Sequence, residues 1–357
     1  MSTSSLKLSG MGMMTSLGQG AESVCAAIRC GLSRPRPIGD VVVWDADAQD
    51  EVPLIGHPVE GVTEGFQGLG RWSRLARLAL SDLIRYSALE AWPGEAWKRC
   101  GFLFCAPSLA PDRFSFHLAE TALLIERLLQ AAKLPIPVES RLFFPLGESA
   151  TWMALKAAGQ HLSSGRWDRA LLLSVDSLLD TSSLRWLAET RRLKGPEHPV
   201  GLMPGEAGVC LLLENPRRCL GRPEATLLAV GMAEAPEEAL SKARGTGQAL
   251  SRAINEALTL TRHAPVGTVI GNLNGEEHRA SAWGLALTQT PRSALPSDVR
   301  EVWPAVNLGD VGAASAAVGM CYAARSMTRR HARPGHTLVW GVSDHGAQGA
   351  VLLDSPT

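Results

Sequence analysis

Apolar runs of strand length alternate with segments of helical spacing from one end of this sequence to the other. In the first part of the chain, strand-like runs occupy residues 6–9, 101–105 and 170–175, and helical spacing covers residues 21–30, 73–88, 114–132 and 149–163. Strands that alternate with helices build sheets covered by helices, so the pattern predicts an α/β fold. With 357 residues, of which 45% are hydrophobic, the chain is long enough to bury a large core.

A stretch rich in Pro, Gly and Arg at residues 215–223 divides the chain after a strand-like run at 209–214. The same alternation then repeats, with strands predicted at 226–230, 268–270, 337–340 and 349–353, and helices predicted at 236–259, about 276–287 and 311–328. We therefore expect two similar α/β halves, residues 1–215 and 223–357.

Charge and cysteine content exclude several functional classes. Lys+Arg and Asp+Glu both total 35, and no basic run is interleaved with aromatic residues, so nucleic acid is not an expected partner. The polar start at residues 1–7 and the lack of a long apolar segment predict neither a signal peptide nor a membrane span, and hence a cytoplasmic protein. The seven cysteines form no C-x-x-C pair, so we expect reduced thiols and no metal site. No motif predicts a cofactor.

Four segments resemble those of β-ketoacyl synthases, and they occur in the family's order. They are a glycine turn at residues 10–18, Ser-Gly-Arg-Trp-Asp-Arg-Ala at 164–170, Pro-Gly-Glu-Ala-Gly at 204–208 and Gly-Asp-Val-Gly-Ala-Ala-Ser at 309–315. The first lacks the third glycine of a dinucleotide fingerprint, which argues against a Rossmann site. The resemblance implies a thiolase-like fold, with two similar α/β halves in a five-layer αβαβα arrangement, and a chain that pairs as a homodimer or heterodimer.

The nucleophile of that family has no counterpart here. Ketosynthases carry a cysteine at a strand-to-helix turn, where the helix N-terminus lowers the thiol pKa and backbone N–H groups form an oxyanion hole. The family's spacing, counted back from Gly165, places this position at Glu148, and no cysteine lies between Cys105 and Cys210. Glu148 could act as a general base or mimic an acylated nucleophile. The simpler interpretation is that its carboxylate caps the helix.

The family's two catalytic histidines are also replaced. By resemblance the first falls in the turn 271–276, at Asn272 or Asn274, and the second falls on Asp310, which could likewise be a helix cap. An accompanying lysine falls near Ala305. Without nucleophile, histidines and lysine, the mechanism of decarboxylative condensation is lost, and we expect no condensing activity.

The same resemblance groups several residues around one former active-site pocket. Its polar positions would be Glu148, Asn272, Asn274 and Asp310, and its wall would include Ser149, Trp152, Ser343 and His345. Trp152 stands four residues after Glu148 and so on the same helix face, where its indole either packs in the core or plugs the acyl tunnel. The triplet 343–345 has the residue types of a hydrolase triad, but three adjacent residues on a turn do not converge on one carbonyl.

Three functions remain open. The leading one is a non-condensing binding or partner subunit that pairs with itself or with an active ketosynthase and contacts an acyl carrier protein or a small acyl ligand. The second is an acyltransferase, hydrolase or decarboxylase that uses Glu148 and Asp310, and the third is a small-ligand sensor. We expect the dimer contact at residues 170–175 and in the segment after Phe114.

Overall fold

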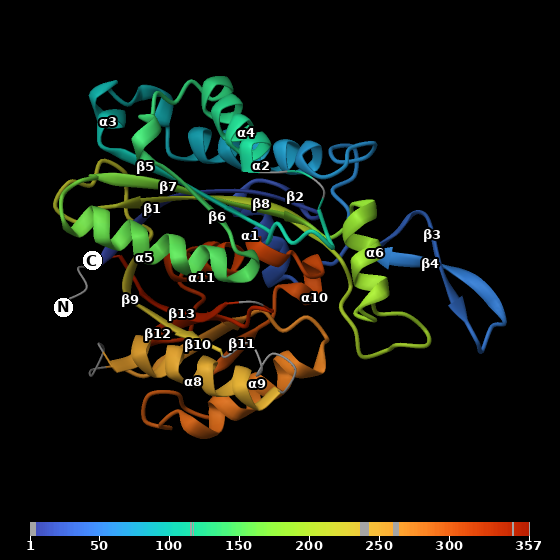
Figure 1. Cartoon of the computed structure of the whole chain (residues 1–357). Coiled ribbons are helices and arrows are strands. Elements are labelled where there is room, and N and C mark those ends of the chain that lie inside the picture. The colour runs from blue at the N-terminus through green and yellow to red at the C-terminus, as the bar shows by residue number, and fades with distance from the viewer. Residues whose placement is uncertain are drawn as a thin grey trace.

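Helices and strands alternate in five layers in the computed structural model of this chain (Figure 1). The structure describes residues 5–114, 116, 118–235, 243–259, 264–344 and 346–356. Two layers of strands lie on either side of a central layer of helices, and further helices cover their outer faces. This arrangement confirms the predicted α/β fold.

The first sheet has the strand order β6-β5-β7-β8-β1. Its strands are β1 (Leu6–Thr15), β5 (Cys100–Ala106), β6 (Arg141–Pro145), β7 (Arg169–Ser177) and β8 (Glu206–Glu214). The β5–β6 and β5–β7 pairs are parallel, whereas β7–β8 and β8–β1 are antiparallel. The short strand β2 (Gly18–Gln19) pairs with the end of β1.

The second sheet repeats the order and the directions of the first. The order β11-β10-β12-β13-β9 is made by β9 (Ala225–Glu234), β10 (Val266–Gly271), β11 (Arg300–Val302), β12 (His336–Gly341) and β13 (Ala347–Asp354). The β10–β11 and β10–β12 pairs are parallel, and the other two pairs are antiparallel. The residues Leu6–Leu8 also pair with β9, so the two sheets are joined at one edge.

Helices occupy the remaining three layers. The central layer contains α1 (Ala21–Arg29), α5 (Ala150–Ser163) and α11 (Ser315–Thr328), one outer layer contains α2 (Leu69–Tyr86), α3 (Glu95–Lys98) and α4 (Leu118–Ala131), and the other contains α8 (Ala243–Thr259) and α9 (Glu277–Gln289) (Figure 1). The 3-10 turns are η1 (Leu89–Ala91), η2 (Val138–Ser140), η3 (Gly147–Ser149) and η4 (Gly312–Ala314). Residues 236–242 of the predicted helix 236–259 lie outside the described residues. Within the described chain, no helix is long and apolar enough to cross a membrane.

The segment 10–18, which we expected to form a turn, belongs mostly to strand β1. All ten residues of β1 are buried. A Cβ atom on Gly12 would lie 2.2 Å from the carbonyl oxygen of Ala79 in α2. Gly12 therefore allows strand β1 and helix α2 to pack closely, because any larger residue at this position would push α2 away.

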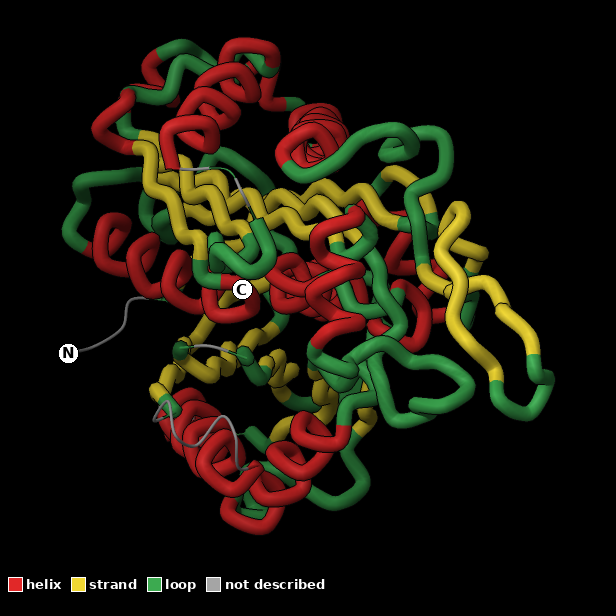
Figure 2. Tube along the Cα trace, turned by 45° about the vertical axis from the view of Figure 1, so that its right-hand side comes forward, coloured by secondary structure: helices red, strands yellow, loops and turns green. Residues whose placement is uncertain are grey.

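Several short elements were not predicted from the sequence. A ribbon formed by β3 (Arg36–Asp45) and β4 (Asp50–Gly56) projects from the body of the molecule (Figure 2). The connection between β7 and β8 contains α6 (Thr181–Glu189), and the connection between β11 and α11 contains the short helix α10 (Ala305–Leu308). Neither connection follows from hydrophobic periodicity, because these segments are short and partly exposed.

Trp152 is fully buried in α5 and fills space on the second sheet. A Cβ atom on Gly349 would lie 2.2 Å from its Cγ, and one on Gly341 would lie 3.0 Å from its Cζ2. The indole thus packs into a depression made by two glycines of β12 and β13. Its interior position agrees with the core interpretation of the sequence.

We predict that Trp152→Ala destabilises the protein by about 3–5 kcal/mol, because the fully buried indole would leave a cavity. Chemical denaturation measures the change. Trp44→Ala is the matched control, since Trp44 on the projecting ribbon is 52% exposed and should change stability little.

We also predict that Gly349→Ala lowers the free energy of unfolding less in the Trp152→Ala variant than in the parent protein, because the indole that its Cβ would contact is gone. Equal costs in both backgrounds would contradict this packing.

Candidate functional site

Glu148 lies in η3, the turn that connects β6 to the N-terminus of the central helix α5. In the second half, η4 leads into α11 in the same way, and the two turns are in contact. Each turn begins with a glycine at positive φ, +59° at Gly147 and +50° at Gly312. Such φ values favour glycine. The duplicated fold therefore places equivalent turns from the two halves against each other.

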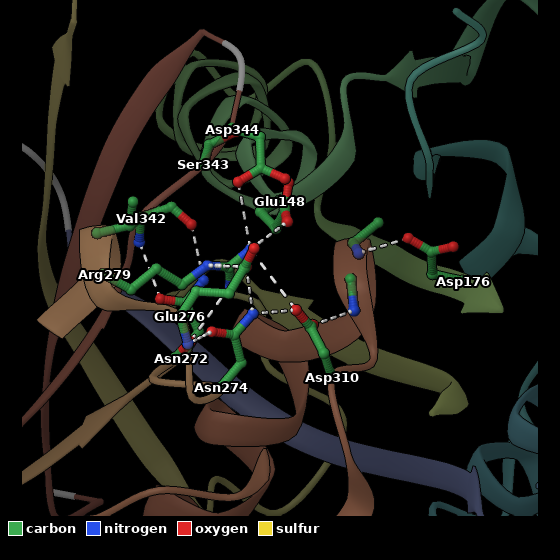
Figure 3. Close-up of polar contacts among 12 residues, drawn as sticks. Glu148, Asp176, Asn272, Asn274, Glu276, Arg279, Asp310, Val342, Ser343 and Asp344 are labelled. Carbon is green, nitrogen blue, oxygen red and sulfur yellow. Dashed lines mark hydrogen bonds and ion pairs between the residues drawn. The ribbon is translucent and has the colours of Figure 1, made fainter. Parts of the chain in front are cut away.

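The carboxylate of Glu148 binds Arg279, which lies in the first turn of α9 and is fully buried (Figure 3). Nη2 of Arg279 lies 2.8 Å from Oε1 of Glu148 and 3.4 Å from Oδ1 of Asp344. The same nitrogen lies 3.6 Å from Oδ2 of Asp310. One guanidinium group thus faces carboxylates that come from three separate segments.

A second arginine completes the cluster. Arg192 follows α6 and donates two hydrogen bonds to Glu276, from Nε at 2.6 Å and from Nη2 at 2.7 Å. Its Nη1 lies 2.6 Å from Oδ2 of Asp344. Asn274 donates from Nδ2 to Asp310 at 2.6 Å and to Glu276 at 2.8 Å. We call Glu148, Arg192, Asn274, Glu276, Arg279, Asp310 and Asp344 the Arg279 cluster.

The buried charges shift the pKa values of the cluster in opposite directions. Burial and the neighbouring Asp344 carboxylate raise the pKa of Glu148 to about 7. Although burial opposes ionisation of Asp344, Arg192 and Arg279 hold its pKa well below its usual value. Glu276 also has a lowered pKa, because its bonds to Arg192 outweigh its burial. Glu148 is therefore the carboxylate that is most easily protonated among these three.

The structure brings together three of the four predicted polar positions. Glu148 and Asp310 both face Arg279, and Asn274 bridges Asp310 to Glu276. Asn272 has a separate role, because its side chain donates to the carbonyl of Val342 at 2.7 Å and accepts from the same residue's N–H at 2.9 Å. It fastens the loop after β10 to the end of β12.

Neither Asp310 nor Glu148 stands at the N-cap position of a helix, but Asp310 does bind the backbone at the start of η4. Oδ1 of Asp310 accepts a hydrogen bond from the N–H of Gly312 at 2.8 Å, at the start of η4. Neither η3 nor α5 has a side-chain cap, and the carboxylate of Glu148 points to Arg279 instead. An ion pair with a buried guanidinium group has replaced the expected helix cap.

The cavity beside Glu148 has a volume of about 50 Å³. Its charged wall is formed by Asp112, Arg113, Glu148, Asp176, Arg192, Asp310 and Asp344, and its apolar wall by Leu146, Leu178, Trp186, Leu187 and Leu202. The predicted wall residues Ser149, Trp152 and Ser343 do not line it. Trp152 instead faces the second sheet because α5 lies between the two sheets, and His345 lies outside the described residues.

The other two predicted wall residues are held by local hydrogen bonds. Oγ of Ser149 donates to the carbonyl of Leu146 at 2.7 Å. The N–H of Ser343 donates to the side chain of Gln348 at 2.6 Å, and the Gln348 amide donates back to the carbonyl of Ser343 at 3.0 Å. Both serines are therefore parts of turns that position Glu148 and Asp344.

The described residues contain one group whose His, Cys, Asp or Glu side chains are close enough to share a metal ion, Glu276, His278 and Asp344. Its two carboxylates already bind Arg192 at 2.6 Å. These bonds satisfy the negative charges that a cation would need, so we assign no metal ligands here. The cluster is an arrangement of protein charges.

Sequence reasoning missed Arg192 and Arg279, which supply both positive charges of the cluster. An arginine near the start of an amphipathic helix or in a loop usually lies at the surface. The sequence feature that could have predicted a buried arginine was the pair of carboxylates expected in one pocket, Glu148 and Asp310. Buried carboxylates require a positive partner or a proton, which would have directed attention to the nearest arginines.

Comparisons with solved structures identify the fold of this chain. No protein-family model and no curated protein matches the sequence. The ishigamide ketosynthase/chain length factor is similar with a TM-score of 0.71 and 18% identity, covering 99% of this chain and 100% of that one.

Two further solved structures agree with this result. The ketosynthase from module 6 of the bacillaene synthase of Bacillus subtilis 168 is similar with a TM-score of 0.75 and 12% identity, covering 99% of this chain and 72% of that one. The AntDE:AntF complex of a type II polyketide synthase acyl-carrier protein with its ketosynthase gives a TM-score of 0.72 and 14% identity, covering 99% and 100%. This chain has the thiolase-like fold of the ketosynthases.

Proposed function

We propose that this chain is a non-condensing ketosynthase homologue that acts by pairing with another chain of the same fold. The observation that supports this most directly is the ion pair between Glu148 and Arg279 at the turn where ketosynthases carry their nucleophile. A carboxyl group bound by a guanidinium group at 2.8 Å is a poor nucleophile whether or not it carries a proton, and without a sulfur atom it cannot form a thioester. The turn therefore has a structural role in this chain.

The small cavity supports the same proposal. A volume of about 50 Å³ accommodates a few water molecules but no acyl chain. Asp310 and Asn274 bind each other and other cluster members, so neither is available to polarise a thioester carbonyl. A sensor for an acyl ligand would also need more space than this cavity provides.

One observation favours the second candidate, an enzyme with altered acyl chemistry. The raised pKa of Glu148, about 7, suits a general acid or base at neutral pH. However, the carboxylate is directed at Arg279 and would have to break that contact to reach a substrate. Partner-subunit function therefore remains the better-supported proposal.

The pairing surface that we propose is the free edge of β6. We expected residues 170–175 at the contact, but this segment belongs to β7, which is fully buried and pairs with β5 and β8 on its two sides. By contrast, β6 is the outermost strand of its sheet, and all five of its residues are half-buried. An uncovered edge strand can add a strand from another chain.

An apolar groove beside β6 supports this location. It has a volume of about 870 Å³ and is lined by α4, η2 and β6. Val138 and Leu118 on its wall are 70% and 60% exposed, and Leu123 is 46% exposed. Apolar side chains grouped at an open sheet edge are typical of a surface that becomes buried on association. The occupant that matches it is the same edge of a second ketosynthase-fold chain.

We predict that the protein forms no acyl adduct at residues 145–150 when incubated with acyl-CoA or acyl-carrier donors, because Glu148 cannot hold a thioester. Intact-mass measurement tests this, with an active ketosynthase as the positive control. A stoichiometric adduct on this turn would falsify the proposal. A measurable thioester hydrolysis rate that Glu148→Gln abolishes would support the enzyme alternative instead.

We predict that the isolated protein is a dimer at micromolar concentration and that Val138→Asp and Leu123→Asp convert it to a monomer. The introduced carboxylates would be desolvated at the apolar contact. Light scattering after size exclusion gives the mass. Val306→Asp is the matched control, because Val306 is also 70% exposed but lies on α10, away from the groove. A monomeric parent protein, or equal effects of all three variants, would argue against this pairing surface.

A further inference from the structure

The Arg279 cluster contains more acidic than basic groups. Its acidic members are Glu148, Glu276, Asp310 and Asp344, and its basic members are Arg192 and Arg279. The side chains of all six groups are at most 17% exposed. With every group ionised, the cluster would hold two uncompensated negative charges with little access to water. Such a state is costly, and a bound proton relieves it.

The surroundings supply little additional positive charge. His278 lies 3.5 Å from Asp344 and is 35% exposed. It adds a positive charge to the cluster only when it is protonated. Arg113 is bound to Asp176, with 2.9 Å between Nη2 and Oδ1, and therefore has its own partner. Arg113 therefore does not compensate the excess negative charge of the cluster.

The contacts identify Glu148 as the group that carries the proton. Glu276 receives two hydrogen bonds from Arg192 and one from Asn274. Asp344 binds Arg192 at 2.6 Å, and Asp310 accepts from Asn274 and from a backbone N–H. In contrast, Glu148 has a single guanidinium nitrogen at 2.8 Å, and that nitrogen also faces two other carboxylates. Its negative charge is the least stabilised of the four.

We propose that Glu148 carries a proton in the folded protein at mildly acidic pH, and that the loss of this proton as the pH rises through neutrality weakens the contact between the two halves of the chain. Glu148 belongs to the first half, whereas Arg279, Asp310 and Asp344 belong to the second. Protonated Glu148 still accepts the hydrogen bond from Arg279 and adds no repulsion toward Asp344. The proposal depends only on this buried cluster and does not require the pairing function proposed above.

The direction of the pH effect follows from linkage. The pKa of Glu148 is raised from an ordinary value of 4.5 to about 7 by burial and by Asp344. Between these values the folded state holds a proton that the unfolded state releases. The contribution to stability is therefore complete below about pH 4.5 and is lost as the pH rises through about 7.

The test compares urea unfolding of the parent protein, Glu148→Gln and Glu277→Gln between pH 5 and 8. The unfolding constant of the parent, divided by that of Glu148→Gln, should rise about tenfold per pH unit up to about pH 7 and then level off, which corresponds to one proton. Titrating groups that do not interact with Glu148 cancel in this ratio. Glu277→Gln should behave as the parent, because Glu277 is exposed at the start of α9, two residues before Arg279. A ratio that does not change with pH would overturn the proposal.

Two further measurements are independent of how well Glu148→Gln folds. Asp344→Asn removes the carboxylate that repels ionised Glu148. The pH range over which the folded protein releases the Glu148 proton should therefore move to lower pH. The infrared spectrum of the parent protein at pH 6 should contain the carbonyl band of a buried protonated carboxyl group, which is lost at pH 9. If Asp344→Asn leaves this pH range unchanged, or if the band is absent at pH 6, the proton is not on Glu148.

Discussion

The burial of the Arg279 guanidinium group constrains the middle of this molecule. A positive charge with no exposure to water must lie against negative groups, and here they come from η3, from the loop before η4 and from the end of β12. Glu148 and Arg279 are 131 residues apart in sequence, so this contact joins the first half of the chain to the second. The Arg279 guanidinium group thus holds these segments together once the fold has brought them close.

The duplicated topology explains why these segments meet. In both sheets the central helix follows the third strand in chain order, so η3 and η4 stand at corresponding ends of α5 and α11. Gly312 approaches Asp176 so closely that a Cβ atom would lie 2.0 Å from its Oδ2. The N–H of Ala313 donates to the same carboxylate at 2.9 Å. Backbone packing between the halves therefore positions the turns, and the charged side chains fill the space that remains.

The sequence predicted the buried elements of the fold better than the exposed ones. Strands β5 and β7 are continuous apolar runs buried on both faces, which periodicity detects. Strand β6 was missed because it is five residues long, begins with Arg141 and ends with Pro145. The glycines of β1 were assigned to a turn, since a single sequence does not distinguish a glycine that bends the chain from one that admits a neighbouring helix. Burial by distant elements makes that distinction.

The candidate site was predictable only on its acidic side. Counting from family motifs placed Glu148 and Asp310 at one pocket, but no local pattern around Arg192 or Arg279 indicates a buried cation. The two sets of charges depend on each other, because Glu148 without Arg279 would be an unpaired buried carboxylate and Arg279 without its acids an unpaired buried cation. Neither charge is stable in the core alone. Glu148 and the arginines that compensate the cluster's acids therefore occupy the space beside η3 together.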